Sequence, residues 1–388
     1  MIPDAGRLIA AAVEETGLDD FGDPGWREGL ERLVASLNGE AGLTPLGEQI
    51  LGGRLAMLLA NRLRVLDVLD TNPEIDDQEV EGPLFIIGLP RTGTTALSNL
   101  LAADPQIRSV RLWESSAPVP PPESLSEGTD PRIDEARRGL DLMYEAFPKM
   151  RSLHFQTATG PTECQDLLGM GFRTEHFGGM ARVPSYSEWA LDCDMSGAYA
   201  FHRRVLQLLQ WHCPPRLWHL KTPVHMLALD DLRTVYPGSR FIWTHRDPAA
   251  VLGSVCSLIA YTRSWASDRR DADELGRAQL ALWAEAIRRA MAFRHRLGER
   301  FFADVGFDSL QSDPVAAVAA AYGQLGIELG GTGRRRVEDW ARAHPPSEHG
   351  AHDFALADFG LEAAEVRGRF APYLERFTGS GGGAAAER

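Results

Sequence analysis

Residues 84–101 read Leu-Phe-Ile-Ile-Gly-Leu-Pro-Arg-Thr-Gly-Thr-Thr-Ala-Leu-Ser-Asn-Leu-Leu, and this stretch decides the fold. The apolar run 84–87 predicts a buried strand, and the pattern from Ala96 to Leu101 predicts a helix. Between them, Gly88 and Gly93 predict a tight loop. A strand, a glycine loop and a helix in this order direct backbone N–H groups and a helix N-terminus at a bound phosphate.

The loop resembles a Walker A loop in spacing but lacks its lysine. Gly88 and Gly93 stand five positions apart, as in that motif, yet Gly93 is followed by Thr94 and Thr95. The missing lysine binds the β- and γ-phosphates of a nucleoside triphosphate. Arg91 supplies a cation inside the loop instead. The loop therefore predicts a phosphate-bearing ligand other than ATP.

Composition limits the classes of partner. The chain has 388 residues, 44% of them hydrophobic, which is enough for one large α/β domain with or without an appendage. Its formal charge of −14 argues against nucleic acid and against an anionic membrane surface as partners. A bound phosphate must therefore meet a local cluster of positive charge.

We expect a cytoplasmic protein without a membrane span. The four cysteines are far apart and show no metal-ligand spacing, so a reducing compartment and no metal site are the simplest interpretation. The N-terminus shows no basic segment leading into an apolar one, so we expect no signal peptide. The longest apolar stretch, 51–69, is interrupted by Arg54, Arg62 and Arg64.

We predict an α/β fold in which helices flank a central parallel sheet, as in P-loop NTPases. Residues 1–80 form an N-terminal helical extension, and residues 81–378 form the main domain, with a mostly helical insertion at about 118–215. The Gly/Ala-rich residues 379–388 form a disordered tail. The N-terminal helices form either a layer packed on the sheet, which we favour, or a cap or homodimer contact.

A second segment carries phosphate-binding side chains. A predicted strand at 240–245 delivers Arg246 to its end, and Pro248 opens a helix that contains Ser254. A guanidinium and a hydroxyl placed in this way can share one phosphate. The alternative is that Arg246 pairs with Asp247 or with another carboxylate at the helix start. Another predicted strand, 217–221, ends on Lys221.

Taken together, Pro90-Arg91-Thr92-Gly93-Thr94-Thr95 and the later Arg246 and Ser254 resemble the PAPS-dependent sulfotransferases, where PAPS is 3′-phosphoadenylyl sulfate. The resemblance is to the branches with arginine in the loop, the bacterial one among them. It implies that the donor's 5′-phosphosulfate is bound by Arg91, Thr92, Gly93, Thr94 and Thr95. It also implies that Arg246 and Ser254 bind the 3′-phosphate. In this family a loop near the C-terminus closes over the nucleotide, and here that loop offers His352.

The function implied is transfer of the sulfuryl group of PAPS to a hydroxyl of a small-molecule alcohol or phenol by in-line displacement. The product of the donor is adenosine 3′,5′-bisphosphate. PAPS has no γ-phosphate and this family needs no Mg²⁺, which accounts for the missing Walker lysine. The insertion at about 118–215 is where we expect acceptor-binding helices and lids.

Such a transfer needs cations on the departing phosphate and a base for the acceptor's proton. Arg91 and Lys221 are the predicted cations. The resemblance implies Glu114 as the first choice for the base, because it follows the phosphate-loop helix where the tyrosylprotein and related branches of the family carry a catalytic glutamate; the alternative is a carboxylate paired with Arg111. His225 is the second choice for the base, and His154 is a remoter one.

Seven aromatic residues either line an apolar acceptor pocket or belong to the core: Trp113, Phe155, Phe172, Phe177, Tyr186, Trp189 and Phe201.

Two other functions compete with this interpretation. A P-loop nucleotide phosphotransferase, or kinase, predicts a lysine after Gly93 and an aspartate at a strand end for Mg²⁺; the lysine is absent and no such aspartate is apparent. An inactive nucleotide-binding protein predicts loss of the cations or the base, whereas Arg91, Lys221 and Glu114 are all present.

Overall fold

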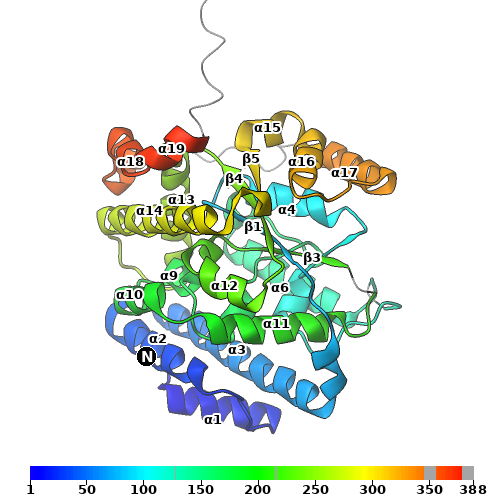
Figure 1. Ribbon diagram of the computed structural model, residues 1–388. Helices are drawn as coiled ribbons and strands as arrows, with labels where there is room; N and C mark the ends of the chain where they lie inside the picture. Colours follow the sequence, from blue (N-terminus) through cyan, green and yellow to red (C-terminus); the bar gives the residue numbers. More distant parts are fainter. Residues whose placement is uncertain (127, 215, 345–354, 378–388) are drawn as a thin grey trace, which may run out of the picture.

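A five-stranded parallel sheet forms the centre of the molecule (Figure 1). The computed structural model of the chain describes residues 1–126, 128–214, 216–344 and 355–377. The strand order is β2-β3-β1-β4-β5, and each neighbouring pair runs parallel. The strands are β1 (Leu84–Gly88), β2 (Ile107–Ser109), β3 (Leu217–Lys221), β4 (Arg240–His245) and β5 (Phe302–Gly306). The predicted parallel α/β sheet is confirmed.

Helices cover both faces of the sheet, which is why its strands read as nearly continuous apolar runs. On one face Leu84, Ile86 and Ile242 pack against one group of helices: α4 (Thr94–Ala102), α15 (Phe307–Ser312), α16 (Pro314–Gln324) and α17 (Gly331–Ala343). On the other face Phe85 and Phe241 pack against a second group: α11 (Ser196–Gln210), α12 (Leu229–Val235), α13 (Pro248–Arg263) and α14 (Ala272–Leu297). Because side chains alternate along a strand, each strand supplies both cores.

The N-terminal helices form a layer that lies beyond α10 and α11, one layer away from the sheet (Figure 1). These helices are α1 (Ala5–Thr16), α2 (Gly25–Glu40) and α3 (Pro45–Thr71), and the 3₁₀ turn η1 (Pro73–Asp77) leads from them to β1. Leu30 and Leu58 belong to the same apolar cluster as Phe85 of the sheet. The N-terminal helices thus form a packed layer, but it rests on helices and not, as we expected, on the sheet itself.

Short helices fill the segment between β2 and β3. They are α5 (Leu112–Ser116), α6 (Pro131–Ala146), α7 (Met150–Leu153), α8 (Gln165–Gly169), α9 (His176–Met180) and α10 (Pro184–Asp192). Helices α6 and α7 share a small apolar cluster of their own, in which Phe147 stacks on Trp265 with ring centroids 4.0 Å apart. This contact holds α6 and α7 against the segment that follows α13.

Two helical segments end at residues with non-helical backbone. The segment 223–235 is divided into the 3₁₀ turn η2 (Pro223–Leu227) and α12, because Ala228 between them is not helical. Helix α14 ends at Leu297, because Gly298 adopts a φ of +100° that favours glycine. The remaining elements are η3 (Glu299–Phe301), η4 (Leu356–Phe359), α18 (Ala363–Arg369) and α19 (Ala371–Phe377). No helix among the described residues is both long and apolar enough to cross a bilayer.

Candidate active site

The phosphate loop turns sharply between β1 and α4. Gly88 has a φ of +139°, and a Cβ there would lie 2.3 Å from Oγ1 of Thr244, so only glycine fits. Thr92 is fully buried, and its hydroxyl lies 2.6 Å from Oγ1 of Thr244 and 2.6 Å from the carbonyl oxygen of Leu89. The Thr92 side chain therefore braces the loop and leaves ligand binding to the backbone.

Helix α4 begins directly after the loop, with Gly93 as its N-cap at a φ of +89°. The first N–H groups of a helix have no acceptor within that helix, and the helix dipole makes this end attractive to anions. Gly93, Thr94 and Thr95 line a cavity of about 670 Å³. The loop and the start of α4 thus border the same cavity.

The two sequence motifs meet at this cavity, although 155 positions separate Arg91 from Arg246. Nε of Arg91 donates to Oγ of Ser254 over 3.1 Å, and Nη1 of Arg246 donates to the carbonyl oxygen of Arg91 over 3.0 Å. Arg91 itself has a φ of +66°, an uncommon conformation for a residue with a side chain. The guanidinium of Arg246 lies 3.9 Å from the ring centroid of Phe307. All four residues line the same cavity.

Neither arginine forms an ion pair with a carboxylate: within the described part of the chain, no acidic side chain lies within 4.0 Å of the guanidinium of Arg91 or Arg246. Burial lowers the pKa of both groups, and the proximity of Arg246 lowers the pKa of Arg91 further, while Asp308 and Asp247 partly oppose the effect on Arg246. The two positive charges repel each other, and a bound anion would relieve that repulsion. This end of the cavity is therefore suited to an anion, although the net charge of the chain is −14.

A lysine–glutamate pair borders the same cavity. Nζ of Lys221, at the end of β3, lies 2.7 Å from Oε1 of Glu163 and 3.4 Å from Oγ1 of Thr95. The carbonyl of Lys221 accepts a hydrogen bond from the N–H of Cys164 over 3.0 Å, which holds the chain around Glu163 beside β3. Burial alone would raise the pKa of Glu163, but Lys221 and His154 outweigh that effect and the pKa lies below its usual range. Glu163 is therefore ionised at neutral pH.

His154 is the other titratable group on this side of the cavity. Burial, helped by the positive charges of Lys221 and Arg91, lowers the pKa of His154 to about 4 despite the opposing effect of Glu163. Its imidazole is therefore neutral at pH 7. Next to His154, the carbonyl of Leu153 accepts a hydrogen bond from Nη1 of Arg91 over 2.6 Å.

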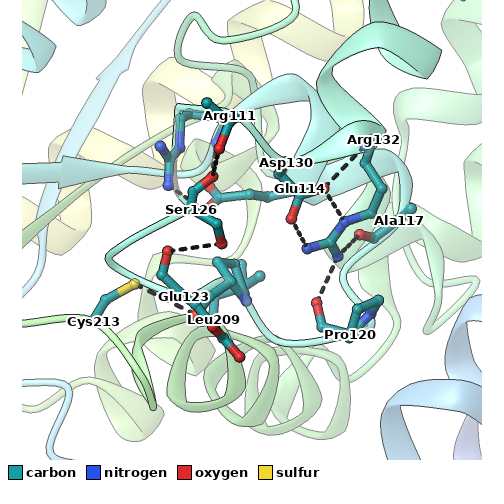
Figure 2. A network of polar contacts seen from close by, with 12 residues as sticks. Arg111, Glu114, Ala117, Pro120, Glu123, Ser126, Asp130, Arg132, Leu209 and Cys213 are labelled. Atoms are coloured by element: carbon teal, nitrogen blue, oxygen red, sulfur yellow. Dashed lines mark hydrogen bonds and ion pairs between the residues drawn. The ribbon is translucent and has the colours of Figure 1, made fainter.

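Glu114, the first choice for the base, belongs to a network of polar contacts that includes Arg111 (Figure 2). It is fully buried and is not among the described residues that line the cavity. Its Oε1 accepts from Arg108 over 2.9 Å and from Arg111 over 2.6 Å, and its Oε2 accepts from the N–H of Arg111 over 2.9 Å. This is the paired-carboxylate alternative, with the pair buried and capping α5. Glu114 has no access here to a substrate hydroxyl.

His225, the second choice for the base, is not among the described residues that line the cavity, although Val224 beside it is. It is fully buried, and its Nδ1 lies 2.8 Å from the hydroxyl of Tyr199. Burial lowers the pKa of His225 well below its usual value. His352 lies outside the described residues, as does the predicted tail. Glu163 was missed because no strand end or glycine loop marks its segment; tertiary hydrogen bonds, among them those from Cys164 to Lys221 and from Thr222 to Glu163, place it.

The wall of the cavity remote from the arginines is mostly apolar, although Glu175, His176 and Gln279 also line it. It is formed by side chains of α6, α7, α13, α14 and the segments beside them, including Met143, Met150, Leu258, Ile259, Trp265 and Leu282. None of the seven aromatic residues singled out from the sequence is among the described lining residues, and most of them are buried in the core. The cavity therefore combines a cationic end at the sheet with an apolar end between helices.

A family model described as "Sulfotransferase family" matches residues 83–330, which include the glycine loop, Lys221, Arg246 and Ser254. The chain belongs to the sulfotransferase family. The fold is accordingly that of the sulfotransferases, which is P-loop-like, and the predicted family is confirmed.

Solved structures support the assignment over nearly the whole chain. Sulfotransferase STF1 from Mycobacterium tuberculosis H37Rv is 32% identical with a TM-score of 0.86, and the match covers 96% of this chain and 99% of that one. Sulfotransferase STF9 from Mycobacterium avium is also 32% identical, with a TM-score of 0.89 and 96% of each chain covered. The N-terminal helices therefore have counterparts in these relatives.

One relative is named after the molecule on which it acts. The omega-hydroxy-beta-dihydromenaquinone-9 sulfotransferase Stf3 of Mycobacterium bovis is 26% identical over 254 residues. The match covers 63% of this chain and 63% of that protein.

Proposed function

We propose that this sulfotransferase moves a sulfuryl group from PAPS to a hydroxyl of an apolar small molecule and releases adenosine 3′,5′-bisphosphate. The observation that supports this most is the meeting of Arg91, Arg246 and Ser254 at one end of a cavity whose other end is apolar. Unneutralised guanidinium groups suit a donor with phosphate at both its 3′ and 5′ positions.

The donor site follows from the positions of these groups. Arg91 and the N–H groups at the start of α4 would hold the 5′-phosphosulfate, and Arg246 with Ser254 would hold the 3′-phosphate. The chain lacks the lysine that a kinase loop uses for a γ-phosphate, because Thr94 follows Gly93. This donor set fits PAPS better than ATP.

We assign the role of the base to Glu163. Bound PAPS supplies an activated sulfuryl group, and the protein must orient the acceptor hydroxyl and take its proton. Glu163 is an ionised carboxylate on the cavity wall and can accept that proton. Lys221, 2.7 Å from Glu163, and Arg91 supply positive charge where negative charge grows on the leaving phosphate. His154, neutral and beside them, is the second candidate for the base.

The acceptor is expected to be an apolar alcohol. Methionine, leucine, isoleucine and tryptophan side chains line the end of the cavity away from the arginines. Methionine adapts to irregular apolar ligands because its side chain is unbranched and flexible. The curated relative Stf3 is named for a hydroxylated menaquinone, a lipid-like acceptor of this kind.

Calorimetric titration with adenosine 3′,5′-bisphosphate, compared with ATP and Mg²⁺, tests the donor. The bisphosphate should bind more tightly than ATP. Arg246→Ala should weaken it about 10- to 100-fold, since a hydrogen bond to a charged group contributes about 1.5–3 kcal/mol. The matched control is Arg335→Ala, an exposed arginine of α17. Tighter binding of ATP with Mg²⁺ than of the bisphosphate would overturn the donor assignment and favour the kinase alternative.

Activity with labelled PAPS and a panel of alcohols and phenols then tests the transfer. Sulfated product should form with apolar alcohols at a higher kcat/KM than with polar ones of similar size. Bisphosphate binding without product from any acceptor in the panel would favour the inactive nucleotide-binding alternative.

A further inference from the structure

The side chain of Glu175 borders three cavities. Glu175 precedes α9 and lines the active-site cavity, a second cavity of about 470 Å³ and a third of about 510 Å³. Gln279 and Leu282 of α14 line both the active-site cavity and the second cavity. Glu175 therefore lies beside the apolar part of the active-site cavity, in the partition that separates it from the second one.

One oxygen of this carboxyl group has no partner. Oε1 of Glu175 accepts a hydrogen bond from the hydroxyl of Ser187 on α10 over 2.9 Å. Oε2 is buried, and no described residue donates a hydrogen bond to it. The nearest cation, Arg263 of α13, directs its Nε to the carbonyl oxygen of Gly178 over 3.0 Å and forms no ion pair with Glu175. A buried polar atom left without a partner destabilises the fold, so its retention calls for an explanation.

The surroundings of Glu175 bring the pKa of its carboxyl group close to neutral pH. Burial raises the pKa of Glu175 to about 7, against the opposing effects of Ser187 and Arg263. The other titratable groups nearby are His176 of α9, whose burial lowers its pKa to about 4, and Tyr186 of α10, whose burial raises its pKa. On α14, Glu274 lines the second cavity and pairs with Arg182.

We propose that Glu175 is a specificity residue that binds a second hydroxyl group of the acceptor, at the end remote from the hydroxyl that receives the sulfuryl group. This inference rests on the proposed function, because it takes the apolar part of the cavity as the acceptor site. The wall formed by Leu258, Ile259 and Leu282 requires the part of the acceptor between the two hydroxyl groups to be apolar. The acceptor class is thus an apolar molecule hydroxylated at two separated positions.

Binding of linear α,ω-diols, each compared with the primary alkanol of the same length, tests this proposal. Fluorescence of the cavity-lining Trp265 and Trp283 reports binding without the need for turnover, with and without adenosine 3′,5′-bisphosphate. The quantity compared is the ratio of diol affinity to alkanol affinity. Glu175→Leu should lower that ratio about tenfold or more for the best diol, since a site built to hydrogen-bond a hydroxyl rejects the analogue that lacks it.

Two further variants separate recognition from packing. Glu175→Gln keeps the shape of the side chain and an oxygen that can accept from Ser187. It should therefore fold normally and retain part of the preference for the diol over the alkanol. Glu188→Leu, an exposed glutamate of α10 that lines the second cavity, is the matched control and should leave the ratio unchanged. In the wild type the ratio should rise as the pH increases through about 7, because an ionised carboxylate is the stronger acceptor, and it should be flat in Glu175→Gln.

The outcomes also separate this proposal from the proposed function. An unchanged ratio in a folded Glu175→Leu variant, or no binding of any alcohol to the wild type, overturns the role of Glu175. If the ratio depends on Glu175 but neither adenosine 3′,5′-bisphosphate nor PAPS binds, the recognition of two hydroxyl groups stands and the donor assignment fails.

Discussion

Two carboxylates, Glu114 and Glu163, each pair with basic side chains in this protein, yet their surroundings differ. Glu114 is fully buried, and Arg108 and Arg111 satisfy both of its oxygens. Glu163 is only partly buried: its Oε1 accepts from Lys221 and its Oε2 from Thr222 and Gln165, but its side chain lines a cavity. A carboxylate enclosed among arginines stabilises local structure, whereas one on a cavity wall is available to a substrate.

The largest expected effect is on turnover in Glu163→Gln. Loss of the carboxylate removes the proposed proton acceptor, so kcat should fall about 100- to 10 000-fold. Calorimetry with adenosine 3′,5′-bisphosphate should show unchanged donor affinity, because Arg91 and Arg246 are intact. Near-normal turnover in this variant would transfer the role of the base to His154, for which His154→Gln is the corresponding test.

Glu114→Gln should instead reduce stability. It leaves Arg108, 3% exposed, without its carboxylate, and breaking a buried pair costs about 3–5 kcal/mol. Urea unfolding measures the loss, and the folded fraction should keep its kcat. A large loss of kcat at full stability would restore Glu114 as the base.

The pH dependence of kcat/KM distinguishes the two carboxylates further. Lys221 holds the pKa of Glu163 below its usual range, so the deprotonated base, and with it the activity, persists as the pH falls to about 4.5 and declines only below that. In Lys221→Met, burial still raises the pKa of Glu163 but the lysine ammonium no longer lowers it. The acid limb of the pH profile of kcat/KM should therefore move to higher pH. An acid limb at the same pH in both proteins would contradict the assignment of Glu163.

The smallest effect is expected for an exposed pair. Glu28 and Arg32 lie one turn apart on α2, each with about half of its side chain exposed. Glu28→Gln should change the free energy of unfolding by less than about 0.5 kcal/mol, because water screens such a pair. Glu28→Gln serves as the control for the urea measurement on Glu114→Gln. If both variants lost a similar free energy of unfolding, the distinction between buried and exposed pairs would not hold.

The order of strands and helices along the chain was largely predictable, because it rests on short-range patterns. The strand and helix around the glycine loop and the strands that lead to Lys221 and Arg246 appear where the sequence indicated. The composition of the cavity wall was not predictable. The aromatic residues that looked suited to an acceptor pocket are mostly core, while methionines of α6, α7 and α9, together with Trp265 and Trp283, line the cavity.

The sequence by itself determined the family and the anion-binding end of the site. A strand, a glycine loop and a helix define that end within a few residues, and glycine at position 88 is required by backbone contact with β4. Only the tertiary structure decided which carboxylate faces the cavity. That choice depends on the hydrogen bond from Cys164 to Lys221 and on the enclosure of Glu114 by arginines. The bond from Cys164 joins segments 57 positions apart in the chain, and the packing that places both carboxylates leaves no local pattern in the sequence.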